Sequence, residues 1–270
     1  MALSVNSNIA SLNSQRQLAN STNELNTSYQ RLSSGKRINS AKDDAAGLQI
    51  SSRLTSQVNG LNQGSRNAND AISLAQTAEG ALEEYTNTVQ RMRTLAVQAS
   101  NGSNTETDLV ALNTEYTELE LELTRISTQA SFGGTDLLDG NYAAEFQIGA
   151  DAGQTISVSI TQDFASATIG ADGSLTSFDG AQSRITDLDS VLATVNSTRA
   201  DLGAKQNRFS SVIRSNDNAA ENVSASRSRI EDTDYAAESA QLARNSVLQQ
   251  AASSMLAQAN QQPQIALSLL

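Results

Sequence analysis

The feature that most constrains the fold is a heptad pattern that runs from residue 185 to residue 230 without a proline. Counted from Ile185 in alternating steps of three and four residues, ten of its fourteen positions are apolar. A stripe this long and narrow is typical of a coiled-coil helix, which packs along another long helix. We expect the polar members of the stripe to set the pairing register at some cost in stability: Arg199, Gln206, Asn216 and Arg227.

Two more long helices are predicted upstream, and Pro263 is the only proline, so no proline interrupts either of them. One covers about 41–100, where an apolar stripe over 54–75 gives way to a neighbouring stripe over 74–99. Such a drift is expected where a helix of 3.6 residues per turn carries a 3.5-residue pattern. The other covers 109–126, where every stripe position is apolar.

The start and the middle of the 41–100 helix carry local signals of their own. Ser40 followed by Asp43 resembles a capping box, which predicts the start of the helix there. Gly60 and Gly64 are expected weak points, because glycine in a helix interior favours a kink.

The two chain ends are predicted to be weak helices over 3–33 and 234–270. Their apolar residues are few and lie among Asn, Ser, Thr and Gln, and Gly35 is a plausible C-terminal cap for the first. Isolated helices of this kind are marginal in water. We therefore expect them to pair with each other or with neighbouring molecules, and the alternative is two frayed tails. Their apolar markers are Val5, Ile9, Leu12, Leu18, Leu25, Tyr29 and Leu32 in the first, and Leu242, Leu248, Met255 and Ala259 in the second.

Residues 140–182 lack helical periodicity. Apolar residues alternate with polar ones around Phe146 and around Val158, with a glycine-containing segment between them, which predicts a β-hairpin over about 140–162. The glycine-rich stretch 163–182 is predicted to be a loop.

Composition excludes several kinds of function. The chain has no Cys and no His, so disulfides, thiol nucleophiles and His-based metal or acid–base sites are excluded. Its net charge of −11 argues against a nucleic-acid partner. No apolar run reaches the length of a membrane helix, and the N-terminus resembles no cleaved signal, so composition alone would suggest a cytosolic protein.

Motifs that could carry chemistry have simpler interpretations. Gly35-Lys36 lacks the spacing of a phosphate loop and is interpreted as a helix cap followed by a solvated lysine. The pairs Asp43-Asp44 and Glu83-Glu84 are adjacent along a helix and therefore point in different directions, which favours a solvated face over an acid–base dyad. We predict that the protein is not an enzyme and uses no cofactor or metal.

Three stretches of the chain resemble bacterial flagellins, in flagellin order and at flagellin spacing. They are RLSSGKRINSAKDDAAGL at 31–48, QRMRTLAVQ at 90–98, and SRIEDTDYA at 228–236 followed by LQQA at 248–251 and LAQANQ at 256–261. The resemblance covers about 1–140 and 180–270. It implies a secreted structural subunit that polymerises into the extracellular filament used for swimming, and it overrides the cytosolic indication.

The resemblance also implies an architecture. The expected fold is mainly α, an elongated long-helix bundle or coiled coil with a small β-hairpin and discontinuous domains built from both chain ends. Residues 1–43 and 232–270 would form an inner-core coiled-coil domain, and 44–231 a rod domain with three long helices, the hairpin and the 163–182 loop. The outer domains of long flagellins are absent.

Assembly is then expected to proceed by folding of the terminal helices at the filament tip. The assembly residues of these helices would be Ile9, Leu12, Leu25, Leu32, Leu242, Leu248, Met255, Leu269 and Leu270. The implied partners are further copies of the chain, hook-junction proteins, the filament cap and an export chaperone on the C-terminal segment, with neither a nucleic acid nor a membrane among them.

Flagellins that Toll-like receptor 5 recognises present an Arg and a Leu on the second helix and a Glu on the third. The matching positions are Arg91, Leu95 and Glu115, and Gln90 and Gln98 also match. Thr94 departs from the acidic residue often found there, which bears on the strength of binding.

Three other functions compete with a flagellin. A hook–filament junction protein shares the terminal pattern, but the matches through both rod segments disfavour it. A flagellin with an enzymatic insert, for example a zinc protease, is disfavoured because the chain has no histidine and the 163–182 loop is short. A secreted coiled-coil adhesin would not form uniform filaments in salt.

Overall fold

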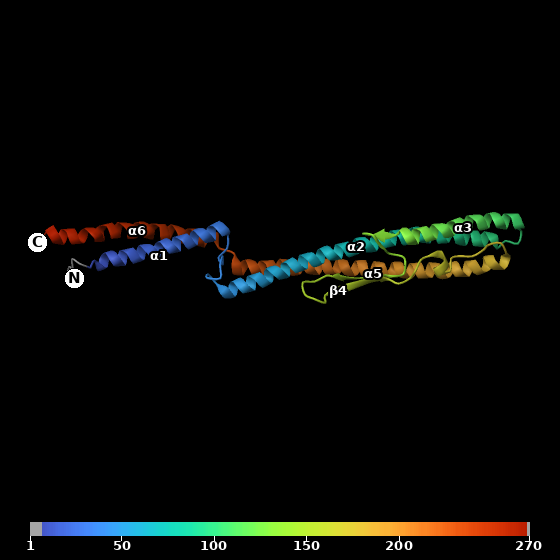
Figure 1. The fold of residues 1–270 in the computed structure, drawn as a ribbon, viewed down its shortest axis with the longest axis horizontal. Helices are drawn as coiled ribbons and strands as arrows, with labels where there is room; N and C mark the ends of the chain where they lie inside the picture. The colour runs from blue at the N-terminus through green and yellow to red at the C-terminus, as the bar shows by residue number, and fades with distance from the viewer. Residues whose placement is uncertain (1–6, 269–270) are drawn as a thin grey trace. The chain divides into compact units, whose positions relative to one another are not determined.

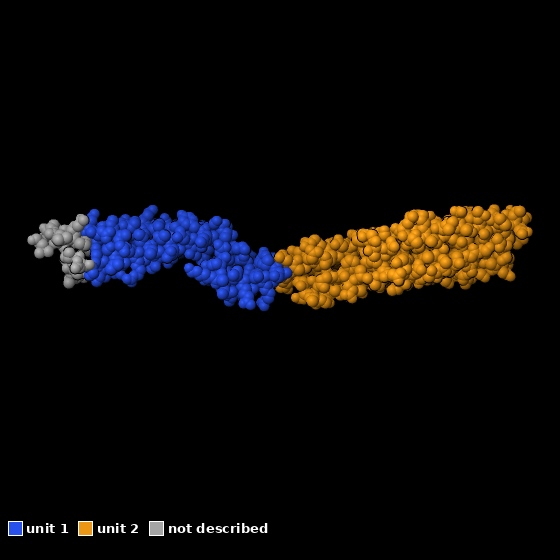
Figure 2. All heavy atoms as spheres, in the orientation of Figure 1, with its two compact units in different colours: residues 1–56, 222–270 blue, residues 57–221 orange. Residues whose placement is uncertain are grey.

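A computed structural model describes residues 7–268, with side chains described as far as Gln261. The chain clusters into two compact units: unit 1 is built from the residues up to 56 and from 222 onward, and unit 2 from 57–221 (Figure 2). The elements are α1 Ile9–Ser34, α2 Ala45–Ala99, α3 Glu106–Gln129, β1 Ser131–Phe132, β2 Thr135–Asp136, β3 Tyr142–Gln147, β4 Thr155–Ile160, α4 Ser166–Ile169, α5 Phe178–Glu231 and α6 Tyr235–Ser268 (Figure 1). The prediction of a mainly α fold of long helices with a small β-hairpin is confirmed.

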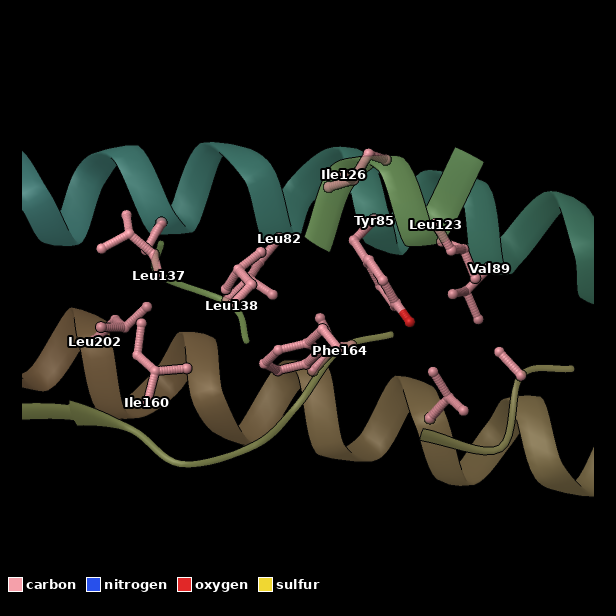
Figure 3. Close-up of a cluster of buried hydrophobic side chains, with 14 of the residues drawn as sticks. Leu82, Tyr85, Val89, Leu123, Ile126, Leu137, Leu138, Ile160, Phe164 and Leu202 are labelled. Carbon is pink, nitrogen blue, oxygen red and sulfur yellow. The ribbon is translucent and has the colours of Figure 1, made fainter. Parts of the chain in front are cut away.

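Unit 2 holds the main hydrophobic core, between α2, α3 and α5 (Figure 3). The heptad stripe of α5 faces this core as predicted, with Leu188, Val195, Leu202 and Phe209 all buried. At the centre of the core the rings of Tyr85 and Phe164 meet edge to face, with centroids 5.6 Å apart. A lone helix cannot bury its apolar stripe. Because these three helices bury their apolar side chains against one another, the stability of each depends on the other two.

The polar members of the α5 stripe bond to other elements. Gln206 donates from Nε2 to Glu79 Oε2 at 2.9 Å, and Asn216 donates from Nδ2 to the carbonyl of Ile148 at 2.7 Å. Arg227 donates from Nη1 to Thr55 Oγ1 at 3.4 Å within unit 1. These bonds join particular residues of facing elements, so they are consistent with the expected role in register.

The hairpin is confirmed: β3 pairs antiparallel with β4, from Tyr142 opposite Ile160 to Gln147 opposite Thr155. Its tip rests on α2, where Asn67 Nδ2 donates to the carbonyl of Gln147 at 2.8 Å. A Cβ on Gly60 would lie 2.8 Å from the Cα of Ala150, and a Cβ on Gly64 would overlap the carbonyl of Ile148. α2 runs through both glycines without a break, and the glycines make room for the hairpin tip.

The expected loop over 163–182 is partly wrong. It contains the short helix α4, and α5 begins at Phe178, ahead of the heptad pattern. Ser177 caps this start, since its Oγ accepts from the backbone N–H of Gly180 at 3.1 Å. The remaining segment is held on α3, where Tyr116 donates its hydroxyl to the carbonyl of Ala171 at 2.8 Å and Asn113 Oδ1 accepts from the N–H of Leu175 at 2.7 Å.

The helix that we expected from about residue 41 begins at Ala45. Asp44 is its cap, because Asp44 Oδ1 accepts from the N–H of Gly47 at 2.8 Å. The proposed capping pair closes a turn instead: Asp43 Oδ2 accepts from the N–H and Oγ of Ser40 at 2.9 and 3.0 Å. These bonds lower the pKa of the Asp43 carboxyl, the bond from the Ser40 N–H most of all. Gly35 ends α1 in the left-handed conformation (φ 72°), as predicted.

Within unit 1, α1 and α6 lie side by side (Figure 1). The cross-helix bonds run in opposite order along the two helices: Asn8 contacts Ala259, Thr22 contacts Gln249, and Arg31 contacts Glu238. The pair is therefore antiparallel. In the described part of the chain, none of the helices is long and apolar enough to cross a bilayer.

Candidate assembly and recognition surfaces

The seam between α1 and α6 is made of small and polar side chains. Its buried members are Ser11, Ser21, Leu25 and Ser28 on α1, and Asn245, Ala252 and Ala259 on α6. Ser11 Oγ donates to Asn260 Oδ1 at 2.7 Å, and Asn8 Nδ2 donates to the carbonyl of Ala259 at 2.7 Å. Asn245 is only 1% exposed, and its Nδ2 has no hydrogen-bond partner among the described residues. The two helices therefore pack closely but bury little apolar area against each other.

The predicted assembly residues divide between this seam and the outside of the pair. Leu25 is buried, and Leu32 and Leu242 are half-buried. Ile9, Leu12, Leu248 and Met255 are exposed, Ile9 by 66% and Met255 by 61%. Leu269 and Leu270 lie outside the described residues.

Pattern analysis missed part of the exposed apolar surface. Val247 and Tyr235 on α6 are both exposed, and neither stood among the expected assembly residues. Tyr29 was placed on the apolar stripe of α1 and is exposed as well. Their spacing forms no single stripe with the other exposed apolar residues, so periodicity carried no signal for them.

The first and third flagellin-like stretches contact each other. The contact joins the segment that connects α1 to α2 with the segment that connects α5 to α6. The N–H of Arg37 donates to the carbonyl of Glu231 at 2.7 Å, and the N–H of Thr233 donates to the carbonyl of Gly35 at 3.0 Å. The Glu231 carboxylate accepts from Lys36 Nζ and from Ser51 Oγ, and these bonds, that from Lys36 first, lower the pKa of Glu231. Lys36 is exposed, as its interpretation as a solvated lysine implied, and in addition it forms an ion pair with Glu231.

The second stretch, on α2, ties that helix to both of its neighbours in unit 2. Arg91 Nε donates to Glu115 Oε1 on α3 at 2.9 Å. Arg93 Nε donates to Asp189 Oδ1 on α5 at 2.6 Å, a bond that lowers the pKa of the Asp189 carboxyl. Both pairs are exposed, so each contributes little to stability and mainly fixes the position of its side chains.

The five residues that we predict for receptor recognition lie only partly on one surface. Gln90, Arg91, Gln98 and Glu115 are exposed, and the structure brings Arg91 and Glu115 into contact. Leu95 is 1% exposed and lies in the core of unit 2, so its side chain supports the patch from beneath. The apolar stripe over 74–99, which contains Leu95, already indicated this burial.

These features define a class of protein: a helical structural subunit with an apolar surface outside its terminal helix pair. Among the described residues, no group of three or more acidic side chains could hold a metal ion. The family model for the bacterial flagellin N-terminal helical region matches residues 5–143, and that for the bacterial flagellin C-terminal helical region matches residues 185–270. The chain belongs to the bacterial flagellin family.

Individual proteins that are similar to this chain are also flagellins. The chain is 38% identical to flagellin A of Vibrio cholerae, 39% to flagellin D of the same species and 38% to polar flagellin C of Vibrio parahaemolyticus, in each case over all of both chains. The crystal structure of Bacillus cereus flagellin is similar with a TM-score of 0.52 and 33% identity, over 56% of this chain and 88% of that one. A flagellar hook-associated protein of Vibrio parahaemolyticus matches with a TM-score of 0.60 over 70% of this chain and all of that one, but at 14% identity, which shows a shared fold alone.

Family membership establishes the general function. The protein is a structural subunit that polymerises with its own copies into the extracellular flagellar filament, and it is not an enzyme. The hook-junction alternative is disfavoured, because the relatives of 38–39% identity are flagellins.

Proposed function

We propose that α1 and α6 complete their folding only when they dock among the terminal helices of other copies at the filament tip. In this proposal, residues 1–43 and 232–270 form the inner-core domain of the filament and residues 44–231 form its rod domain. The observation that carries it is the pair of opposed surfaces on α1 and α6: a polar seam inside and exposed apolar side chains outside.

The energetics favour this order of events. Apart from Leu25, the seam buries serines, alanines and an asparagine whose Nδ2 has no hydrogen-bond partner among the described residues, which together supply little hydrophobic stabilisation. Burial of a large apolar side chain contributes about 1.5–3 kcal/mol, and Ile9, Leu12, Val247 and Met255 are still exposed in the single chain. Most of the burial that would order these helices is therefore available only between copies.

The experiment deletes residues 1–40 or, separately, 231–270, and measures circular dichroism and polymerisation. We expect soluble, mostly helical monomers that form no filaments. A second variant, Ile9→Ser with Leu12→Ser, keeps the seam and removes outer apolar side chains, and it should also block polymerisation. The control Asn13→Ser changes an exposed polar residue of the same helix. Normal filaments from the truncated chains would contradict coupled folding.

We also infer that the exposed patch of Gln90, Arg91, Gln98 and Glu115 is recognised by Toll-like receptor 5. The Arg91–Glu115 pair presents one basic and one acidic group in a fixed arrangement, above the buried Leu95. Arg91→Ala and Glu115→Ala should each weaken binding of the monomer to the receptor ectodomain by roughly tenfold or more. Arg125→Ala, which breaks the exposed Arg125–Glu122 pair on α3, is the control and should leave binding unchanged.

The remaining partners follow from the same exposed helices. We infer that an export chaperone covers the apolar side chains of α6, with Val247, Leu248 and Met255 as its contacts, before assembly. Hook-junction proteins and the filament cap would offer terminal helices of similar kind at the two ends of the filament. Val247→Ser with Met255→Ser should abolish chaperone capture by α6, whereas Ser253→Ala, at an exposed polar position, should not.

A further inference from the structure

The chain contains two Asn-Gly pairs, and the structure places them in different surroundings. Asn59 and Gly60 lie inside α2, whereas Asn101 and Gly102 lie in the segment that connects α2 to α3. Both asparagines are exposed, so access to water does not distinguish the two pairs. An asparagine side chain is most open to attack by the following backbone nitrogen when that residue is glycine, because glycine has no side chain to obstruct the approach.

The backbone nitrogen that follows the asparagine is available in only one of the two pairs. Among the described residues, nothing accepts a hydrogen bond from the Gly102 N–H, whereas the Asn101 N–H donates to the carbonyl of Gln98 at 3.2 Å. The Gly60 N–H lies inside a helix, where each N–H donates to the carbonyl four residues earlier. The Asn59 side chain also leans toward the N-terminus of its helix, and so away from the nitrogen that follows it.

The Asn101 side chain is folded over the peptide of Gly102. Ser103 donates its N–H to Asn101 Oδ1 at 3.2 Å, which closes an Asx turn around Gly102. The turn brings the Asn101 Cγ toward the Gly102 nitrogen. The same hydrogen bond would stabilise the negative charge that develops on Oδ1 when a nucleophile adds to Cγ.

Exposure outside a helix is not enough to give this arrangement. Asn39 is also exposed, lies outside a helix and precedes the small residue Ser40. The Ser40 N–H, however, donates to Asp43 Oδ2 at 2.9 Å. Its nitrogen is therefore engaged, whereas that of Gly102 is not.

We propose that Asn101 is a site of spontaneous deamidation in the folded chain. The Gly102 nitrogen loses its proton to hydroxide and forms a bond to Asn101 Cγ, the bond from Cγ to Nδ2 breaks, and Nδ2 leaves as ammonia. Water then opens the succinimide ring: cleavage of the new bond to Cγ gives aspartate, and cleavage of the bond to the backbone carbonyl carbon of residue 101 gives isoaspartate. Nothing is oxidised or reduced, and water and hydroxide are the only other reactants.

Each conversion changes unit 2 where α2 ends. It adds one negative charge to residues 57–221, which contain nine basic and 22 acidic residues and so already carry a net charge of −13. The new carboxylate lies beside the last carbonyls of α2, where the helix dipole disfavours negative charge. Isoaspartate also lengthens the backbone between α2 and α3 by one methylene group. The reaction is not reversed by water, so the modified fraction rises with the age of the protein.

The first test compares the two Asn-Gly pairs of the full-length protein. The protein is incubated at mildly alkaline pH in ¹⁸O-water, and its peptides are analysed by electron-transfer mass spectrometry, which distinguishes aspartate from isoaspartate. We expect Asn101 to take up the isotope and to give mainly isoaspartate, and Asn59 to convert more slowly by roughly tenfold or more, because local opening of α2 must come first.

The same incubation in guanidinium chloride unfolds α2, and both asparagines should then convert at similar rates. The proposal is overturned if Asn101 converts no faster than Asn59 in the folded protein. It is equally overturned if Asn59 stays slower in guanidinium chloride, because the difference would then not arise from the structure.

The second test uses Gly102→Ala as the matched variant. Gly102 is not in the left-handed conformation, and a Cβ there would meet nothing within 4 Å, so alanine fits the fold. We expect Asn101 to convert severalfold more slowly in this variant, with an unchanged circular dichroism spectrum. The control Ser103→Ala keeps Gly102 and the N–H that bonds to Asn101, and it should convert at the original rate. An unchanged rate in Gly102→Ala, or an equal slowing in the control, would refute the proposal.

Discussion

At the residue scale, close approach between backbones depends on single side chains. The hairpin tip lies on α2 because residues 60 and 64 are glycines, and the Asn67 amide then binds the carbonyl of Gln147. Helix propensity alone would disfavour both glycines, at about 1 kcal/mol each relative to alanine. Their packing role outweighs that local cost.

Gly64→Ala should therefore destabilise unit 2, because its Cβ meets backbone atoms of Ile148 that cannot rotate away. We expect a loss of about 1–3 kcal/mol in the free energy of unfolding, measured by urea titration with far-ultraviolet circular dichroism. Gly80→Ala in the same helix meets nothing within 4 Å and should gain about 0.5–1 kcal/mol. Equal effects at the two sites would show that the hairpin tip does not pack on α2 in this way.

Removing the hydroxyl group should change protein stability in different ways at two buried tyrosines. The Tyr85 hydroxyl is buried without a partner among the described residues, whereas the Tyr116 hydroxyl donates to Ala171. We expect Tyr85→Phe to be neutral or stabilising, and Tyr116→Phe to cost about 1 kcal/mol. Thermal unfolding of the two variants tests this, and a destabilised Tyr85→Phe would indicate a bound water on that hydroxyl.

Glu231 should make unit 1 sensitive to acid. Its bonds from Lys36 and Ser51 lower its pKa below the ordinary value of 4.5, so its stabilising effect is complete above that value and is lost as the pH falls through the lower folded-state pKa. Glu231→Gln should weaken protection of the Arg37 and Thr233 amides from hydrogen exchange at pH 7, and should remove part of the acid dependence. Protection factors with the same pH profile in both proteins would contradict this.

At the element scale, helix ends are set by side-chain caps. Thr105 Oγ1 accepts from the N–H of Asp108 at 3.4 Å, and Asp108 Oδ2 accepts from the N–H of Thr105 at 2.9 Å, so α3 begins with a complete capping box. The bonds to Thr105 also lower the pKa of the Asp108 carboxyl, that to its side chain most of all. Sequence periodicity placed the α3 stripe correctly but carried no information about this start.

Thr105→Ala should cost about 1 kcal/mol of stability through loss of the cap. The same substitution at Thr114, an exposed position inside α3, should be neutral or slightly stabilising, because alanine has the higher helix propensity. Urea midpoints of the two variants provide the measurement, and an unchanged midpoint for Thr105→Ala would mean that packing alone defines the start of α3.

At the scale of the whole molecule, assembly depends on the balance between apolar burial and charge. The terminal helices expose apolar side chains, whereas unit 2 carries a net charge of −13. Repulsion between exposed like charges is screened within about 10 Å at 0.1 M salt. Apolar burial is far less sensitive to salt at these concentrations.

The critical concentration for polymerisation should therefore fall as ionic strength rises from about 10 mM to 150 mM. Sedimentation of filaments at each salt concentration gives the value directly. Truncation of the terminal helices should abolish assembly at every salt concentration, which separates the two contributions. A critical concentration that rises throughout this range would show that attraction between unlike charges dominates.

Much of the fold could be predicted, because long helices and hairpins carry strong periodic signals. The α5 stripe and the alternation around Val158 identified their elements directly. The segment after β4 could not be predicted, because Tyr116 and Asn113, which hold it, lie far away in sequence. The resemblance to flagellins located the Arg91 and Glu115 pair, but only packing shows that Leu95 lies beneath it.

The order of amino acids by itself determined the helical class, the absence of histidine and cysteine chemistry, and membership of the flagellin family, since each depends on composition or on short-range pattern. Tertiary structure alone decided which apolar side chains of α1 and α6 remain exposed, and that Lys36 pairs with Glu231. Periodicity shows that a helix has an apolar stripe, but only the packed neighbours decide whether that stripe is already covered.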